Sequence, residues 1–381
     1  MNSHLTQNLA SRGVKGDFKF TDTQSFRLFV EGMKGLSAYE RSAEQDSLRT
    51  AETKLVKCVK EYPRDVLPQF YLGVVKVFQG YRGVDEAIRV FENIEQNVPV
   101  LRPAAMYNLA AAYIEQYTLE SLDLARNWLK KCIKELGKDE SVERASLRLQ
   151  AEVLLLFYEI RQRLWVKRTD PVDALREELD NTVPELQGKL DEFLVQANAA
   201  RRIPDAARTD IMADYWNNRG ILEEFQAWTA PNPKEKKKRA ETAINSYEES
   251  LKWKLNWIPP KSNMARVYMD LLEDYDSAIR CWQEVQQVRP DDNYAEYMLG
   301  RLFEKKGDLV SAISHYEKAP YIPEAKKRRA FLYEQFSRLG DAIRVWQEIL
   351  AKRPEDKDAL AARVRLRFTI PTPASDAEPT T

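Results

Sequence analysis

The order of apolar and polar positions predicts helices rather than strands along the chain. In the segment from Tyr297 to Ala319, apolar residues recur every three or four positions on both sides of a short break at Gly307. Residues three or four apart lie on the same face of an α-helix, whereas a half-buried strand would show strict alternation. The segment therefore predicts two short antiparallel helices joined by a turn at Gly307.

Small residues stand at fixed places in this helical hairpin. Gly300 follows Leu299 in the first helix, and Ala312 and Ala319 lie in the second. Two helices can approach closely only where their side chains are small, and bulky residues such as Tyr316 then fill the holes beside them. A single hairpin cannot bury its own apolar faces, so several copies are expected to stack.

The second-helix pattern, an Ala followed four residues later by an aromatic residue, recurs at a regular distance. Ala278 and Trp282 precede Ala312 and Tyr316 by 34 residues. The pattern returns at Ala342, at the shorter distance of 30 residues from Ala312. A 34-residue period with a Leu-Gly pair in the first helix is the signature of one repeat family. The chain thus resembles the tetratricopeptide-repeat family.

The resemblance covers most of residues 24–366 and implies an all-α fold, a right-handed solenoid of helical hairpins in two arrays joined by longer helices. Further second-helix alanines extend the pattern: Ala51, Ala87, Ala125 and Ala243. The expected divisions are a leader (1–23), an amino-terminal array (24–137), a helical spacer (138–214), a carboxy-terminal array (215–366) and a Pro-rich, disordered tail (367–381).

Residues 138–214 do not follow the repeat. The segment VERASLRLQAEVLLLFYEIRQRLW predicts one helix longer than a repeat helix, and further helical stretches are expected near 171–180 and 184–201. A helical spacer between two arrays and badly degenerated repeats both remain open as interpretations.

An insertion at 229–239 lengthens the hairpin that begins near Gly220 by 11 residues. It contains the segment PNPKEKKKR, residues 231–239, which is rich in Pro and charge. This composition favours an exposed loop.

Charge and composition exclude several functions for the chain as a whole. It carries 59 basic and 59 acidic side chains, so it has no net attraction to nucleic acid or anionic lipid. No stretch reaches the roughly 18–20 apolar residues of a membrane helix, and the amino terminus has no signal-peptide run, so a cytoplasmic protein is expected. Two short basic runs, residues 234–239 and 326–329, keep a nucleic-acid-associated protein open as a second hypothesis.

The residues that could carry catalysis are better explained by packing or exposure. His315 lies beside Tyr316 in a second helix, and the sequence has no phosphate-binding, zinc-protease or serine-hydrolase motif. Cys58 and Cys132 occupy the same small-residue position, seven residues after a signature alanine. With Cys281 they are too widely spaced for a disulfide framework or a zinc site. No enzyme activity, metal or cofactor is expected.

The resemblance implies a concave surface, lined by the first helix of each hairpin, where members of this family hold a protein partner. Carried onto this chain, the residues just before and after the first-helix Leu are expected to face it. They are Phe70, Tyr71, Val74, Tyr107, Asn108, Asn217, Asn218, Ile221, Tyr297, Met298, Arg301, Lys327, Arg328 and Phe331. Tyr and Arg are frequent interface anchors, and the groove is expected to change from aromatic at its amino-terminal end to basic at its carboxy-terminal end.

A second expectation from the resemblance is a clamp for carboxylates, by which some family members hold the acidic tail of a chaperone. Asn108 stands where the second-repeat Asn of such a clamp would be, and Arg144 and Arg148, four residues apart, resemble its basic pair. The first-repeat Lys and Asn are missing, because Phe70 and Val74 stand there. The expectation is therefore a modified carboxylate site.

The leading hypothesis is an adaptor or scaffold that binds a peptide segment or a domain of a partner protein in the groove. A nucleic-acid-associated protein and a regulatory subunit of an enzyme encoded elsewhere are the alternatives, and a homo-oligomer stays open. The identity of the partner is not in the sequence.

Overall fold

The structure is a computed structural model that describes residues 18–42, 44–80, 83–116, 119–137, 141–165, 172–200 and 203–367. All regular elements in these ranges are helices, which confirms the predicted all-α fold. The chain divides into two compact units, Met1–Val267 and Tyr268–Thr381, and each is described by itself. Most of the expected leader and tail, residues 1–17 and 368–381, lies outside the described ranges.

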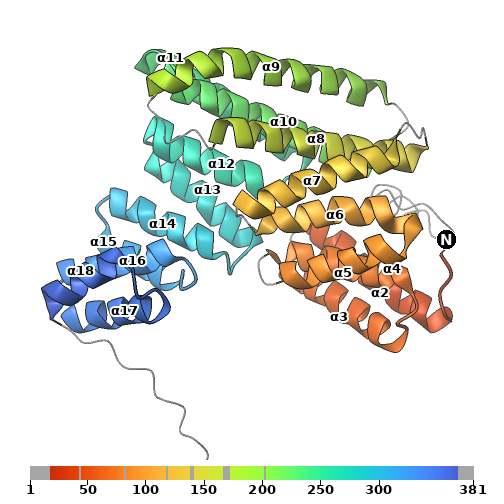
Figure 1. Ribbon diagram of the computed structural model, residues 1–381, viewed down its shortest axis with the longest axis horizontal. Coiled ribbons are helices and arrows are strands. Elements are labelled where there is room, and N and C mark those ends of the chain that lie inside the picture. The colour runs from red at the N-terminus through yellow and green to blue at the C-terminus, as the bar shows by residue number, and fades with distance from the viewer. Residues whose placement is uncertain are drawn as a thin grey trace, which may run out of the picture. The chain divides into compact units, whose positions relative to one another are not determined.

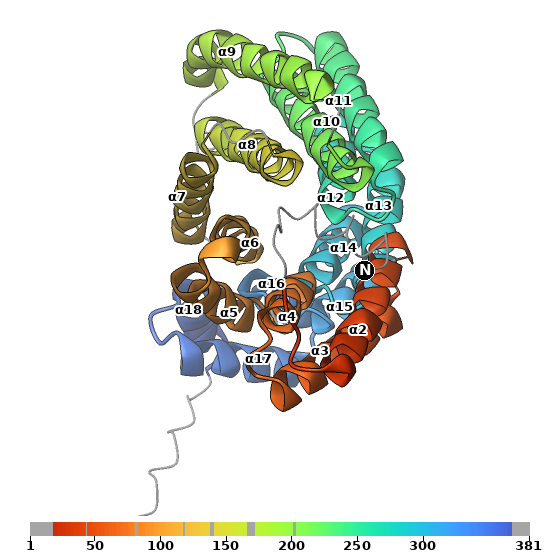
Figure 2. The same ribbon diagram turned by 90° about the vertical axis from the view of Figure 1, so that its right-hand side faces the viewer.

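Unit 1 is a stack of helical hairpins in which each helix packs on the one before it. Figure 2 shows α6, α8 and α10 along one side of this stack and α7, α9 and α11 along the other. The helices are α2 (Thr23–Ser42), α3 (Gln45–Glu61), α4 (Val66–Phe78), α5 (Val84–Asn97), η2 (Pro99–Leu101), α6 (Arg102–Glu115), α7 (Leu119–Leu136), α8 (Val142–Trp165), α9 (Val172–Ala199), α10 (Asp205–Trp228), α11 (Pro233–Trp253) and α12 (Ile258–Val267).

Unit 2 contains shorter hairpins in the same order along the chain (Figure 1). Its helices are the π-helix η3 (Tyr268–Leu272), α13 (Tyr275–Val288), α14 (Asn293–Lys305), α15 (Leu309–Glu317), α16 (Pro323–Gln335), α17 (Leu339–Lys352) and α18 (Lys357–Leu366). The side chains of Tyr316 and Trp346 are fully buried in its core, beside the predicted small residues Ala312 and Ala342.

The first and second helices of a hairpin approach closely where a glycine faces an aromatic ring. A Cβ atom placed on Gly300 would lie 2.5 Å from Cε1 of Tyr316, and one on Gly220 would lie 2.5 Å from Cε1 of Tyr247. Real Cβ atoms do not come this close to a ring carbon, so each ring occupies the space that any other residue would fill. The predicted role of Gly300 in helix packing is confirmed, and Gly220, which follows Arg219, packs in the same way.

The structure differs from the expected division around residues 138–214. Two separate stretches were expected near 171–180 and 184–201, but α9 is one helix that continues through Pro184. Buried residues at helical spacing, Val183, Leu186, Leu190 and Phe193, hold this part of α9 against the stack, and packing of such a face outweighs the cost of one proline. Helix α10 also runs unbroken through the expected boundary at 214 and 215.

The expected loop at residues 231–239 is largely helical, because α11 begins at Pro233. The side chain of Asn232 caps this helix, since its Oδ1 accepts a hydrogen bond from the backbone N–H of Glu235 at 2.9 Å. Proline suits the first helical position, and the Lys, Glu and Arg residues that follow are good helix formers. The insertion therefore lengthens α10 and α11 instead of forming a loop.

We expect Gly300→Ala to destabilise the protein. Alanine in a helix interior is normally more stable than glycine by up to about 1 kcal/mol, but here the added Cβ would collide with Tyr316. The net loss in the free energy of unfolding is expected to be about 1–3 kcal/mol, as for other overpacked cores. Urea denaturation followed by tryptophan fluorescence measures it.

Gly188→Ala is the matched control, because Gly188 lies in the interior of α9 with open space around it. This change should raise the free energy of unfolding by about 0.5–1 kcal/mol. Equal responses of the two variants would contradict a close approach of helix and ring at Gly300.

Candidate functional site

A carboxylate in the first helix of three hairpins joins that hairpin to the next one. In unit 1, Glu224 of α10 is 1% exposed and accepts a hydrogen bond from the Tyr247 hydroxyl of α11 at 3.0 Å. The same carboxylate accepts hydrogen bonds from Nε and Nη2 of Arg266 in α12, at 2.8 and 2.7 Å. We call this arrangement of Glu, aromatic residue and Arg a carboxylate tie. Burial and two-pronged geometry make such a pair strong.

Two further carboxylate ties stand in unit 2. Glu304 of α14 accepts a hydrogen bond from the Tyr316 hydroxyl at 2.7 Å and pairs with the Arg328 guanidinium of α16. Glu334 of α16 accepts one from Nε1 of Trp346 at 2.8 Å, and Arg365 of α18 binds the same carboxylate at 2.8 and 2.9 Å. Each tie involves the second-helix aromatic residue of its hairpin, so the packing residues of the repeat are also hydrogen-bond donors.

The sequence reasoning did not identify these ties. In the first two, the acid stands four residues after the packing glycine, Gly220 or Gly300, and this spacing is a signal that could have located Glu224 and Glu304. The arginine partner could not have been found in this way, because it comes from the next hairpin at no fixed distance along the chain.

The series of ties is interrupted at α14. Trp282 is the second-helix aromatic residue of the hairpin before α14, and its buried Nε1 has no hydrogen-bond partner among the described residues, unlike Nε1 of Trp346. The Tyr294 ring of α14 lies 5.6 Å from that of Trp282, edge to face, and 53% of the surface of Tyr294 is exposed. An aromatic side chain is therefore available to solvent where α13 meets α14.

Two more residues of α14 extend this aromatic surface along the helix. Tyr297 and Arg301 follow Tyr294 at helical spacing, and the ring centroids of Tyr294 and Tyr297 lie 6.1 Å apart. The Arg301 guanidinium carbon lies 5.9 Å from the centroid of the Tyr297 ring. We call Tyr294, Tyr297 and Arg301 the tyrosine–arginine face. Burial raises the pKa of Tyr297, which keeps its hydroxyl neutral.

The local sequence explains why these side chains share one face. Asp292 caps α14, and its Oδ1 accepts hydrogen bonds from the backbone N–H groups of Tyr294 and Ala295 at 2.9 and 3.0 Å. Met298 and Leu299, on another side of the helix, are buried in the core. The cap and the core together fix the rotation of α14 and leave the tyrosine–arginine face outward.

The expected basic carboxy-terminal groove is mostly neutralised within the fold. Lys327 lies 2.7 Å from both Asp356 and Asp358, and Arg328 belongs to the tie with Glu304. Phe331 is 40% exposed, although its ring also contacts that of Trp346 at 5.0 Å. Among the described residues, Arg301 takes part in no ion pair.

The basic run at residues 326–329 is divided by the structure. Lys327 and Arg328 are paired with carboxylates as above, whereas Lys326 lies near Lys352 of α17. Burial and the positive charge of Lys352 lower the pKa of Lys326. The Arg329 guanidinium carbon lies 5.9 Å from the centroid of the Tyr333 ring.

Several expected groove residues are core residues, which corrects the prediction made from the resemblance. Phe70, Tyr71 and Val74 of α4 have almost no exposed surface. Phe70 packs against the ring of Phe91 at 5.6 Å. Met298 of α14 and Ile221 of α10 are likewise buried. An aromatic groove at the amino-terminal end is therefore absent at these positions, because their side chains fill the space between helices.

The three expected asparagines are buried and hold helices in place. Nδ2 of Asn108 donates to the Ala104 carbonyl at 2.8 Å, and Nδ2 of Asn218 donates to the Val153 carbonyl of α8 at 2.9 Å. Oδ1 of Asn217 accepts from Nδ2 of Asn263 at 3.0 Å. These buried amides satisfy backbone and side-chain groups and are not presented to a partner.

The expected modified carboxylate site is not assembled either. The amide of Asn108 is directed to its own helix. Arg148 donates to the Gly137 carbonyl at 3.1 Å and lies 3.4 Å from Glu152. Arg144 also takes part in a side-chain interaction within the fold. Tyr107 of α6 is partly exposed, and it stays a predicted contact residue.

The side chains that could act in catalysis are buried in the core or take part in contacts within the fold. Cys58 and Cys132 are fully buried, as predicted, and burial raises the pKa of Cys132 to about 12. Nδ1 of His315 lies 2.7 Å from Oε2 of Glu296, and its ring stacks on that of Phe303. In the part of the chain that the structure describes, no group of His, Cys, Asp and Glu side chains could hold a metal ion, and no helix could cross a membrane.

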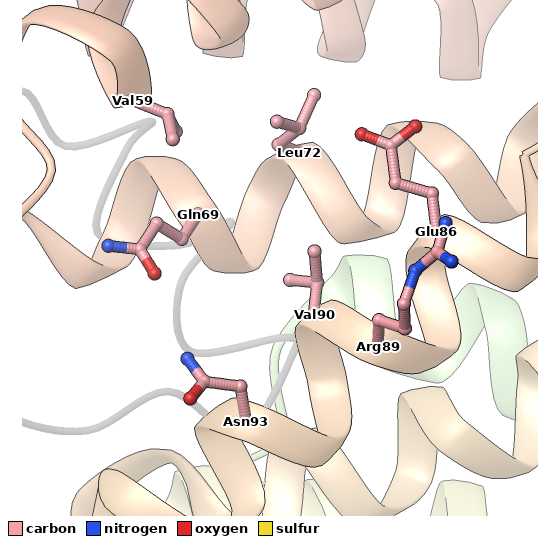
Figure 3. A pocket seen from close by; sticks show the side chains of 7 residues that line it. All are labelled: Val59, Gln69, Leu72, Glu86, Arg89, Val90 and Asn93. Carbon is pink, nitrogen blue, oxygen red and sulfur yellow. The ribbon is translucent and has the colours of Figure 1, made fainter.

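Unit 1 also has a shallow hollow between α3, α4 and α5. Figure 3 shows the apolar residues that line it, Val59 of α3, Leu72 of α4 and Val90 of α5, with the Val90 side chain directed toward α4. Polar and charged side chains surround these apolar groups, and one of them, Glu86, is engaged with Lys76 at 2.8 Å. No residue predicted to bind a partner lines this hollow.

Comparison with known protein families bears on the region that carries the tyrosine–arginine face. A sequence model described as tetratricopeptide repeat matches residues 263–326, which include all of α14. Residues 263–326 are therefore similar to tetratricopeptide repeats. The match confirms the resemblance deduced from the 34-residue period, and it falls where that period is met.

Solved structures similar to this repeat protein have low sequence identity. The structure described as functional characterization of Pseudomonas aeruginosa pilF is 13% identical, with 69% of this chain and 97% of that chain covered and a TM-score of 0.40. A human IFIT1 dimer with PPP-AAAA is 15% identical, with 96% and 95% covered and a TM-score of 0.46. A thermophilic TPR protein of Thermus thermophilus, TTC0263, is 15% identical, with 69% and 97% covered and a TM-score of 0.29.

A search of curated proteins finds no match to the chain. At the identities and TM-scores above, the solved structures carry no argument about what this repeat protein binds.

We expect Glu224→Gln to lower the free energy of unfolding by roughly 3–5 kcal/mol, the usual cost of removing one partner of a buried ion pair. The amide keeps the shape of the side chain but leaves the charge of Arg266, which is 17% exposed, without its counter-ion. Urea denaturation measures the effect.

Glu241→Gln is the control, because Glu241 lies exposed on α11, 4.0 Å from Lys237. It should change the free energy of unfolding by less than about 0.5 kcal/mol. A Glu224 variant as stable as this control would show that the tie does not hold the repeats together.

Proposed function

We propose that the protein is a non-catalytic adaptor that binds a segment of a partner protein on the tyrosine–arginine face of α14. The observation that carries the proposal is the exposure of Tyr294, which is 53% exposed beside the rings of Trp282 and Tyr297. An exposed aromatic residue at the end of a row of ordered rings offers apolar surface that a partner can cover. Tyr and Arg are also the residue types that contribute most to interfaces.

The rigidity of the surroundings supports this role. Tyr297 is held between Tyr294 and the fully buried Tyr316, whose ring centroid lies 6.1 Å away. The cap at Asp292 fixes the start of the helix. Side chains that are already ordered lose little entropy when a partner binds, so more of the contact energy appears as affinity.

A non-catalytic role agrees with the state of the candidate nucleophiles. The buried Cys132 thiol has a raised pKa and donates to the Pro103 carbonyl at 3.3 Å, so it is neither ionised nor accessible. A thiol acts as a nucleophile in its ionised form. The chemistry of this chain is therefore best described as recognition.

Association with nucleic acid receives less support from the same contacts. Two of the four cations of the run at residues 326–329 are paired with carboxylates, and the run at 234–239 includes an ion pair between Arg239 and Glu235 at 2.9 Å. Fewer free cations mean fewer phosphate contacts and a weaker attraction. A protein partner is therefore proposed.

Tyr294→Ala is expected to reduce recovery of the partner at least tenfold, because an interface anchor contributes about 2 kcal/mol or more. The measurement is quantitative mass spectrometry of proteins recovered with the tagged full-length chain from its native cells. Tyr321→Ala is the control of the same residue type, since Tyr321 is highly exposed but lies in the turn between α15 and α16.

The control should recover the same proteins as the unchanged chain. If the unchanged chain and the Tyr294 and Tyr321 variants recover equal amounts of the partner, the interface lies away from the tyrosine–arginine face. Circular dichroism should show that the helix content of both variants is unchanged.

A further inference from the structure

Arg301 is the cation on the tyrosine–arginine face whose charge is not balanced by an ion pair with a described residue. Two arginines of later helices in unit 2 are balanced: Arg328 of α16 by Glu304, and Arg365 of α18 by Glu334. Lys327 of α16 is balanced by two aspartates. Arg301 is therefore the place on the tyrosine–arginine face that can take a negative charge.

The surroundings of Arg301 prepare its guanidinium to bind a carboxylate. The group rests against the Tyr297 ring, and its Nη1 lies 3.8 Å from Sδ of Met298. The Tyr297 ring and the Met298 sulfur are both weak hydrogen-bond acceptors, so the other N–H groups of the Arg301 guanidinium stay available to a ligand. A guanidinium fork fits the two oxygens of a carboxylate, and partial burial beside aromatic rings strengthens the attraction.

The spacing along α14 sets the distance between the charged and the apolar part of the ligand. Tyr294 and Arg301 are seven residues apart, which in a helix is roughly 10 Å along the axis. An extended peptide advances about 3.3 Å per residue. A side chain that covers the Tyr294 and Tyr297 rings would therefore stand two or three residues from one that reaches Arg301.

We infer that the bound segment is an extended peptide with one acidic side chain, held by Arg301, two or three residues from an apolar side chain that packs on Tyr294 and Tyr297. This inference rests on the proposed function and adds the chemistry of the partner. Lys327 and Arg328 of the next first helix, α16, are paired with carboxylates, whereas a polyanion would need several free cations along its path. The charge of Arg301 and the rings of the exposed Tyr294 and the partly buried Tyr297 define the ligand together.

The test is selection from a phage-displayed library of random 12-residue peptides on the immobilised full-length protein, run in parallel on Arg301→Glu and Lys305→Glu. Lys305 is the matched control, because it lies on the same helix and carries the same charge but is directed toward Tyr275 of α13, with Nζ 5.7 Å from that ring. The unchanged protein and the Lys305 variant should both enrich Asp or Glu two or three residues from an apolar residue.

The selected peptide with the highest affinity is then synthesised with a fluorescent label and titrated against each variant. Arg301→Glu should weaken binding at least tenfold, and replacing the peptide acid by its amide should weaken binding to the unchanged protein by a similar factor. The amide peptide should lose little further affinity for the Arg301 variant, because the interaction it would break is already absent. Circular dichroism confirms that each variant keeps its helix content.

The outcomes separate this inference from the proposed function. Peptides that depend on Tyr294 but carry no enriched acid, or bind Arg301→Glu equally well, would overturn the inference and leave the adaptor function standing. If no selected peptide depends on Tyr294, the proposed function falls and the inference with it. Binding of a labelled single-stranded RNA that is lost in Arg301→Glu, without any peptide selected, would overturn both in favour of a nucleic-acid ligand.

Discussion

The contact between a glycine in one helix and an aromatic ring in the next determines how the repeats are joined. Gly300 lets the ring of Tyr316 lie directly against α14. At that depth the Tyr316 hydroxyl reaches Glu304, one turn further along the same helix, and Glu304 is then positioned to hold Arg328 of the following hairpin. The same order of contacts runs from Gly220 through Glu224 to Arg266 in unit 1. Packing within a hairpin thus places the polar group that joins it to its neighbour.

Much of the fold could be predicted because its signals are local. The helical spacing and the small residues near Gly300 depend only on neighbours within one hairpin, and the structure confirms them. The continuation of α9 through Pro184 could not be predicted. Its apolar face stabilises the helix only when it packs against the neighbouring helices, and that packing is not visible in the local sequence. The start of α11 at Pro233 was misjudged for a different reason. The Pro and charged residues were interpreted as loop signals, although Asn followed by Pro is typical of a capped helix start.

The candidate site was only partly predictable from the sequence. Tyr297 and Arg301 were located through the resemblance, and the structure places both beside the exposed Tyr294. The same reasoning failed for Phe70 and Asn217, because burial depends on how near the adjacent helices come, and this varies among hairpins of different length. The neutralisation of Lys327 could not be foreseen at all, since its two aspartates stand at the start of α18, in the next hairpin.

Because the series of ties is interrupted between α13 and α14, salt should affect the contacts between successive hairpins to different extents. The joint between α14 and α16 includes a partly exposed pair of opposite charges, Glu304 and Arg328, which mobile ions screen. Between α13 and α14 the rings of Trp282 and Tyr294 meet instead, and such apolar contacts are not weakened by screening. Concentrated salt would therefore loosen the contact between α14 and α16 while α13 and α14 stay together. Helix α14 would keep its support from α13 in the conditions that weaken the contact with the hairpin after it.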